Sequence, residues 1–167
     1  MTIQLVEQPQ PVSDPLEALE AIAGALDLES ERIDDDELHV AVPGAWRDSG
    51  VWFTWRPELS TLQIGSPLDI KAPDARRGQA ARLVSLINER LWVGHFDVWS
   101  EDNAFVYRNA AILPADGAVD AAQAKALIQG AAEAIDRFLP AFNYFVWGGK
   151  SAEDSLQSSL FDTVGSA

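Results

Sequence analysis

Hydrophobic residues recur every three or four positions in three stretches of the chain, and each stretch predicts a helix with one apolar face. The first helix is expected to begin at Asp14, because an aspartate followed by a proline is typical of a helix N-terminus. The second is expected to run from about Asp74 to Val93 and to end at Gly94. The third is expected to begin at Asp120 and to end at the pair Gly148-Gly149.

Other residues add detail to the ends and the course of these helices. Pro140 lies inside the third helix and is expected to kink it or to break it in two. Ser151 and Asp154 have the spacing of a capping pair, so a short C-terminal helix is expected to follow. Gly94 and one residue of the pair Gly148-Gly149 are expected to adopt a positive φ, because that conformation commonly closes a helix.

The hydrophobic period changes to two between these helices, which is the pattern of β-strands with one buried face. Three such strands are expected within residues 38–70, and two more near residues 95–100 and 104–113. The resulting order is α-β-β-β-α-β-β-α with a short C-terminal helix. This order predicts an α+β fold, a two-layer sandwich in which a five-stranded antiparallel sheet carries the helices on one face.

The length of 167 residues predicts a single domain. Residues 1–12 contain two prolines and three glutamines and are expected to form a flexible N-terminal arm. Residues 13–162 are expected to form the domain, and residues 163–167 a frayed tail.

The net charge of −14 is distributed unevenly, since residues 1–42 hold eleven acids and one base. A chain of this charge repels phosphate groups, so we expect neither nucleic acid nor an anionic membrane surface as a partner. The acidic N-terminal part is explained either by attraction to a basic partner or simply by solubility. The chain has no cysteine and no long apolar stretch, which predicts a cytoplasmic protein without disulfides.

The chain lacks the motifs of the common catalytic and cofactor sites. Residues Gly149-Lys150-Ser151 resemble the end of a phosphate-binding loop, but that loop needs a glycine where Tyr144 stands and a strand before it. The two histidines, His39 and His95, lie on different predicted strands, and neither belongs to a metal-binding or serine-hydrolase pattern. We therefore expect no cofactor, no metal site and no catalytic residue, in a protein that is not an enzyme.

Tryptophans carry the strongest functional signal in the sequence. Trp52 and Trp99 are expected on the opposite side of their strands from the neighbouring core residues Phe53 and Phe96. If helices cover only one face of the sheet, both indoles lie on the open face, where large aromatics often mark a binding or dimer surface. The alternative is that loops or the terminal helix cover them.

Four motifs occur in combination: Val42-Pro43-Gly44 with Trp46, the strand 52–56, the stretch 88–99 and the stretch 140–151. Together they resemble the YbjN family, described as "putative bacterial sensory transduction regulators". The resemblance covers roughly residues 14–164 and implies a fold like that of type III secretion chaperones, a small antiparallel sheet with helices against one side. That fold binds extended segments of other proteins and often forms homodimers. The family has no accepted catalytic residues, so the resemblance supplies none.

The residues and the resemblance together predict a non-enzymatic cytoplasmic protein that binds a protein or peptide segment, as a regulator or chaperone-like adaptor. A homodimer is left open. The predicted partner-binding residues are Trp52, Arg56, His95 and Trp99. The alternative is an enzyme or small-ligand receptor with a pocket near Trp92, His95 and Trp147. A deep pocket with convergent polar groups would favour this alternative, whereas a flat or grooved aromatic surface would favour the adaptor.

Overall fold

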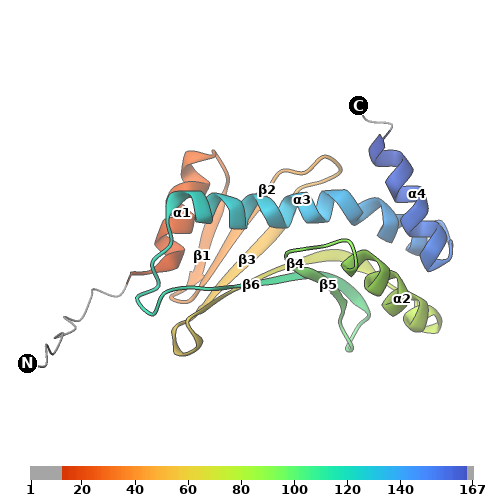
Figure 1. Cartoon of the computed structure of the whole chain (residues 1–167), viewed down its shortest axis with the longest axis horizontal. Coiled ribbons are helices and arrows are strands. Elements are labelled where there is room, and N and C mark those ends of the chain that lie inside the picture. The colour runs from red at the N-terminus through yellow and green to blue at the C-terminus, as the bar shows by residue number, and fades with distance from the viewer. Residues whose placement is uncertain (1–12, 165–167) are drawn as a thin grey trace, which may run out of the picture.

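The computed structural model describes residues 13–164, which form four helices and six strands (Figure 1). In chain order these are α1 (Pro15–Ala25), β1 (Ser30–Asp34), β2 (Glu37–Val42), β3 (Ser49–Arg56), β4 (Thr61–Lys71), α2 (Arg77–Asn88), β5 (His95–Val98), β6 (Ala104–Ile112), α3 (Ala121–Val146) and α4 (Ala152–Val164). The predicted N-terminal arm, residues 1–12, lies outside the described residues. The predicted tail does so from residue 165 onwards, because α4 continues through Val164.

The strands form one open antiparallel sheet in the order β1-β2-β3-β4-β6-β5, so the predicted α+β fold class is confirmed. The predicted number of strands was too small by one, because β1 was missed. The sequence of β1, Ser-Glu-Arg-Ile-Asp, has no alternating apolar face, and none of its residues is buried. An edge strand held mainly by its backbone pairing with β2 leaves no hydrophobic signature in the sequence.

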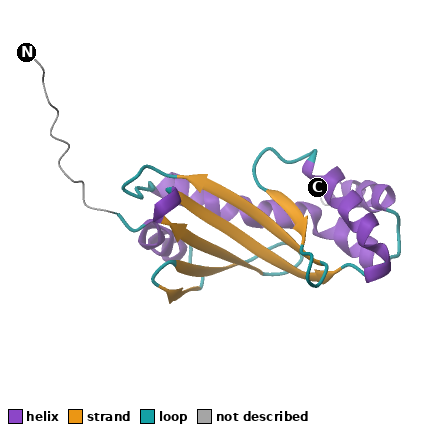
Figure 2. Cartoon of the chain, turned by 90° about the horizontal axis from the view of Figure 1, so that it is seen from below, coloured by secondary structure: helices purple, strands orange, loops and turns teal. Residues whose placement is uncertain are grey.

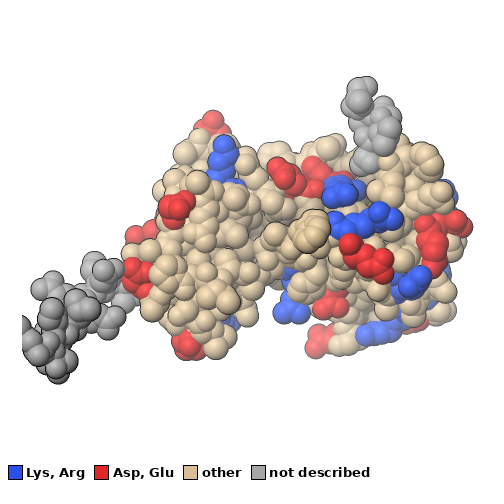
Figure 3. Space-filling view, in the orientation of Figure 1, with Lys and Arg blue, Asp and Glu red and all other residues tan. Residues whose placement is uncertain are grey.

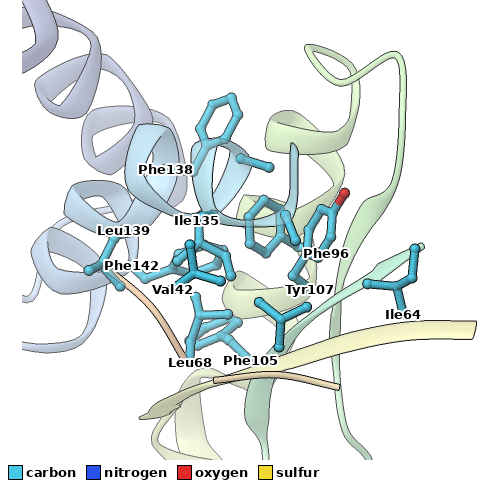
Figure 4. Close-up of a cluster of buried hydrophobic side chains, with 14 of the residues drawn as sticks. Val42, Ile64, Leu68, Phe96, Phe105, Tyr107, Ile135, Phe138, Leu139 and Phe142 are labelled. Atoms are coloured by element: carbon cyan, nitrogen blue, oxygen red, sulfur yellow. The ribbon is translucent and has the colours of Figure 1, made fainter. Parts of the chain in front are cut away.

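The core lies between the sheet and the two helices α1 and α3 (Figures 1 and 2). Figure 4 shows its aromatic centre, where Phe96 of β5 and Phe105 of β6 meet Phe142 of α3. The ring centroid of Phe142 lies 4.6 Å from that of Phe105 and 5.1 Å from that of Phe96. At one end of the molecule, α2 packs beside β5, and α4 packs on α2 and α3. Figure 2 shows the opposite face of the sheet without a covering helix among the described residues.

Three of the four helices begin where the sequence predicts. The Asp14 carboxylate accepts a hydrogen bond from the backbone amide of Leu16 at 2.9 Å, and so caps α1. The Asp120 carboxylate accepts from the amide of Gln123 at 2.8 Å at the start of α3. Before α4, the Ser151 hydroxyl oxygen accepts from an amide in the first turn of the helix at 3.1 Å. These side chains satisfy amides that a helix leaves without an internal partner.

The second helix is shorter than predicted at both ends. A 3-10 turn (Asp74–Arg76) precedes α2, and the Asp74 carboxylate accepts from the side-chain amide of Asn103 at 2.5 Å and does not cap the helix. The helix ends at Asn88, so the prediction that Gly94 terminates it was wrong. The predicted positive φ of Gly94 is nevertheless confirmed, at 70°. Its cause is the packing of the strand start against Tyr107, described below.

The third helix is continuous. It runs through Pro140 as a single α-helix of 26 residues, so the proline does not break it in two. Pro140 is buried in the core, and this packing offsets the hydrogen bond that the proline cannot make. The predicted positive φ after the helix is confirmed at Gly149, with a value of 64°.

Candidate functional site

A row of side chains crosses the helix-free face of the sheet. The strand register pairs His39 with Trp52, Trp52 with Gly65, Gly65 with Arg108, and Arg108 with His95. Because paired residues of neighbouring strands point to the same face, these five positions form one line across β2, β3, β4, β6 and β5. The two tryptophans predicted on the open face are indeed accessible there, with Trp52 half-buried and Trp99 42% exposed.

The middle of this row is concave. A hollow of about 410 Å³, which we call the sheet hollow, lies over β3, β4, β5 and β6. Its lining residues are Trp52, Thr54, Gln63, Ile64, Gly65, Gly94, His95, Trp99, Val106, Arg108, Asn109 and Ala110. None of these residues is an aspartate or a glutamate, although the chain contains 26 such residues. The sheet hollow therefore combines two indoles with basic and neutral polar side chains.

The indole of Trp52 forms one wall of the sheet hollow. The imidazole of His39 stacks on it, with ring centroids 5.4 Å apart and an interplanar angle of 17°. The Nε2 atom of His39 lies 2.6 Å from a carboxylate oxygen of Glu37, which fixes the imidazole in this position. Since β2 and β4 flank β3 on opposite sides, the other face of the indole is turned towards Gly65, which has no side chain to cover it.

The opposite side of the sheet hollow carries Arg108 and the exposed His95. The guanidinium Nη1 of Arg108 lies 3.7 Å from a carboxylate oxygen of Asp97, and both side chains are about half exposed. This separation is longer than a hydrogen bond, and an ion pair so exposed contributes little to stability. The guanidinium group thus remains available to a ligand.

Two interactions fix the position of β5, which carries His95 at the edge of the sheet. The side-chain amide of Asn88, at the end of α2, forms two hydrogen bonds with the backbone of Phe96, at 2.8 and 3.0 Å. Gly94 lies directly over Tyr107, and a Cβ atom at this glycine would stand 2.2 Å from the phenolic oxygen. Burial raises the pKa of Tyr107 above its ordinary value. Asn88 at the end of α2 and the buried ring of Tyr107 thereby hold β5 in the position that presents His95 on the open face.

Of the four residues predicted for partner binding, the sheet hollow brings three together: Trp52, His95 and Trp99. Arg56 is not among its lining residues. Its guanidinium group lies 3.2 Å from a carboxylate oxygen of Asp36, in the turn between β1 and β2. The hydrogen bond between Asp36 and Asp34 raises the pKa of Asp36, and the charge of Arg56 acts in the opposite direction.

Sequence reasoning missed Gly65 and Arg108 as members of the site. Alternation within each strand places both on the open face, but only the pairing of β4 with β6 makes them neighbours. These two residues are 43 positions apart in the chain, and no local pattern encodes their register.

The structure does not support the alternative pocket near Trp92, His95 and Trp147. Trp92 is fully exposed and Trp147 is 78% exposed, so neither indole helps to enclose a cavity with His95. Within residues 13–164, no three His, Asp or Glu side chains are grouped so that they could hold a metal ion. No helix in the same range has the length and hydrophobicity needed to cross a bilayer.

Comparison with known proteins adds a family and a related fold. The model of the YbjN family, described as "Putative bacterial sensory transduction regulator", matches residues 15–143. The fold is similar to the solved structure described as "Crystal structure of YbjN, a putative transcription regulator from E. coli", with a TM-score of 0.53 and 15% sequence identity. That match covers 75% of this chain and 87% of the other. No curated protein matches the sequence. At this identity the structural likeness establishes the fold alone.

Proposed function

This chain belongs to the YbjN family, and on that premise we propose that it is a non-enzymatic regulatory protein that binds another protein through the sheet hollow. The observation that carries the proposal is the meeting of Trp52, His95 and Trp99 in one concavity on the helix-free face. Accessible aromatics in a concave patch are the usual anchors of protein interfaces, where a few such residues supply most of the binding energy.

The chemistry of the sheet hollow supports binding rather than catalysis. Its ionisable lining residues are His95 and Arg108, and an arginine stays protonated at all physiological pH values. General acid–base catalysis usually needs two groups whose protonation states differ. The carboxylate beside Arg108, that of Asp97, is ion-paired with it at 3.7 Å and is not among the lining residues.

One observation favours a second candidate function, the binding of a small ligand. The volume of about 410 Å³ lies within the range of pockets that hold small molecules. The sheet hollow, however, opens over four adjacent strands, and such a shallow surface suits an extended segment better than an enclosed ligand.

The proposal is tested with a double variant, Trp52→Ser/Trp99→Ser, used as bait in extracts of the source organism. The matched control is Trp92→Ser/Trp147→Ser, which removes two exposed indoles that lie outside the sheet hollow. We expect the wild type and the control to retain the same cross-linked partner, and the double variant to lose it. The reason is that each buried interface aromatic commonly contributes about 2 kcal/mol or more of binding free energy.

Circular dichroism and thermal unfolding of the three proteins decide how a loss is interpreted. An unchanged melting temperature of the double variant, together with the lost partner, supports the proposal. Equal partner retention by all three proteins would contradict it. Unfolding of the double variant alone would also contradict it, because the two indoles would then be structural residues.

A further inference from the structure

Gly65 occupies a position where nothing in the backbone requires glycine. It lies inside β4, between β3 and β6, and its φ is not in the left-handed region. A Cβ atom built there would meet nothing closer than 3.9 Å, from the Cε3 atom of Trp52, which is ordinary van der Waals contact. Glycine in a strand interior lowers stability, and often marks a place where a ligand approaches the backbone closely.

The missing side chain creates a slot in the sheet hollow. Trp52 and Arg108 stand on either side of Gly65 on the neighbouring strands, so their backbones are about 10 Å apart across two strand spacings. A flat group placed over Gly65 would contact the face of the Trp52 indole that His39 does not cover. A larger residue in place of Gly65 would fill the same space.

Charge determines what else the slot accepts. The lining of the sheet hollow holds Arg108 and His95 and no acidic residue, in a chain whose net charge is −14. Among the described residues, the guanidinium of Arg108 has the 3.7 Å ion pair to Asp97 through Nη1, and no hydrogen bond occupies its Nε or Nη2. A carboxylate placed beside Arg108 could therefore form a charge-assisted hydrogen bond.

We propose that the sheet hollow recognises an extended segment of a partner protein that places an aromatic ring over Gly65 and a carboxylate beside Arg108. This inference rests on the proposed function and specifies the chemistry of the partner. Thr54 and Gln63 continue the lining along β3 and β4 on the same face as Trp52 and Gly65, and their polar groups suit the backbone of a bound segment.

The direct test uses the peptide acetyl-Gly-Phe-Ala-Asp-Gly-amide and the same peptide with asparagine in place of aspartate. In an extended peptide the phenyl ring and the carboxylate are two residues apart, so they point to the same side at a spacing of about 7 Å. Binding is measured by calorimetry and by the NMR signals of the Trp52 and Trp99 indoles. We expect the aspartate peptide to bind about tenfold more tightly than the asparagine peptide.

Two variants test the slot and the charge separately. Gly65→Val is expected to weaken binding of the aspartate peptide at least about tenfold without lowering the melting temperature, because valine suits a strand and fills the slot. Its matched control is Gly50→Val, on the same face of β3 but outside the lining, where a Cβ meets nothing within 4 Å. Arg108→Gln is expected to remove the difference between the two peptides, whereas Arg90→Gln, at an exposed position in the turn that follows α2, preserves it.

The outcomes separate this inference from the proposed function. Equal affinities of the two peptides, wild-type affinity of Gly65→Val, or binding of neither peptide would overturn the inference, and the partner-capture result for Trp52 and Trp99 would still stand. A further binding measurement uses N-acetylphenylalanine, which carries an aromatic ring and a carboxylate without a peptide segment. If it binds as tightly as the aspartate peptide, the site accepts a small aromatic acid, and the proposed protein partner is overturned as well.

Discussion

At the scale of single residues, glycines occur in this fold for different physical reasons. Gly94 and Gly149 adopt a positive φ, which a residue with a side chain rarely tolerates. A second constraint applies to Gly94, because a Cβ atom there would overlap the Tyr107 ring. Gly65 has neither a positive φ nor a close neighbour at its Cβ position. The absence of its side chain instead leaves space in the sheet hollow.

Replacement of Gly94 by valine is predicted to lower the free energy of unfolding by at least ~1 kcal/mol, because a β-branched residue resists positive φ and its Cβ clashes with Tyr107. Denaturant unfolding measures the effect. Gly78→Ala is the control, since a Cβ at this position of α2 meets nothing within 4 Å. Equal stability of Gly94→Val and the wild type would refute the account.

At the scale of elements, side chains from helices position strands and loops of the sheet. Asn88 of α2 holds the backbone of Phe96, so the edge strand β5 has a fixed partner on its outer side. Asp136 of α3 accepts a hydrogen bond from the amide of Ala45 at 2.8 Å, and its carbonyl accepts from the Trp46 indole at 3.2 Å. This contact gives the family-like residues around Gly44 a structural role in anchoring the β2–β3 loop to α3.

The variant Asn88→Ala is predicted to lower the free energy of unfolding by roughly 1–3 kcal/mol, because both hydrogen bonds to the backbone of β5 are lost. Amide hydrogen exchange at Phe96 is expected to become faster than in the wild type. Asn143→Ala is the matched control, because Asn143 is exposed on α3. Unchanged exchange at Phe96 in Asn88→Ala would show that α2 does not hold the edge strand.

At the scale of the whole molecule, the dominant property is negative charge, and it is not uniform. In the view of Figure 3, Lys and Arg side chains are concentrated over the end formed by α2 and α4, whereas the α1 end carries mainly Asp and Glu. The solved structure from E. coli is described as "a putative transcription regulator", yet a chain with a net charge of −14 repels DNA. This charge agrees with the proposed binding of another protein.

We therefore predict that the purified protein gives no electrophoretic shift of duplex DNA at concentrations up to about 10 µM, even at low salt where electrostatic attraction is strongest. A salt-dependent shift in this range would contradict the prediction and would indicate a local basic surface that overcomes the net charge. Sedimentation of the same sample measures whether the chain also self-associates, which the sequence leaves open.

The sequence by itself determined the features that depend on neighbours along the chain. Helix caps at Asp14 and Asp120, and the positive φ of Gly149 after α3, follow from local hydrogen bonding and sterics. The placement of Trp52 on the helix-free face follows from alternation within one strand. Such signals need only a few consecutive residues, so they can be recognised without the fold.

Only the tertiary structure decided which of these residues meet. The edge strand β1 has no apolar alternation. The second helix ends at Asn88, whose side chain reaches the backbone of β5. The slot between Trp52 and Arg108 depends on the register of β4 with β3 and β6. That register is set by packing of the whole sheet against α1 and α3, and packing is a property of residues that are distant in sequence.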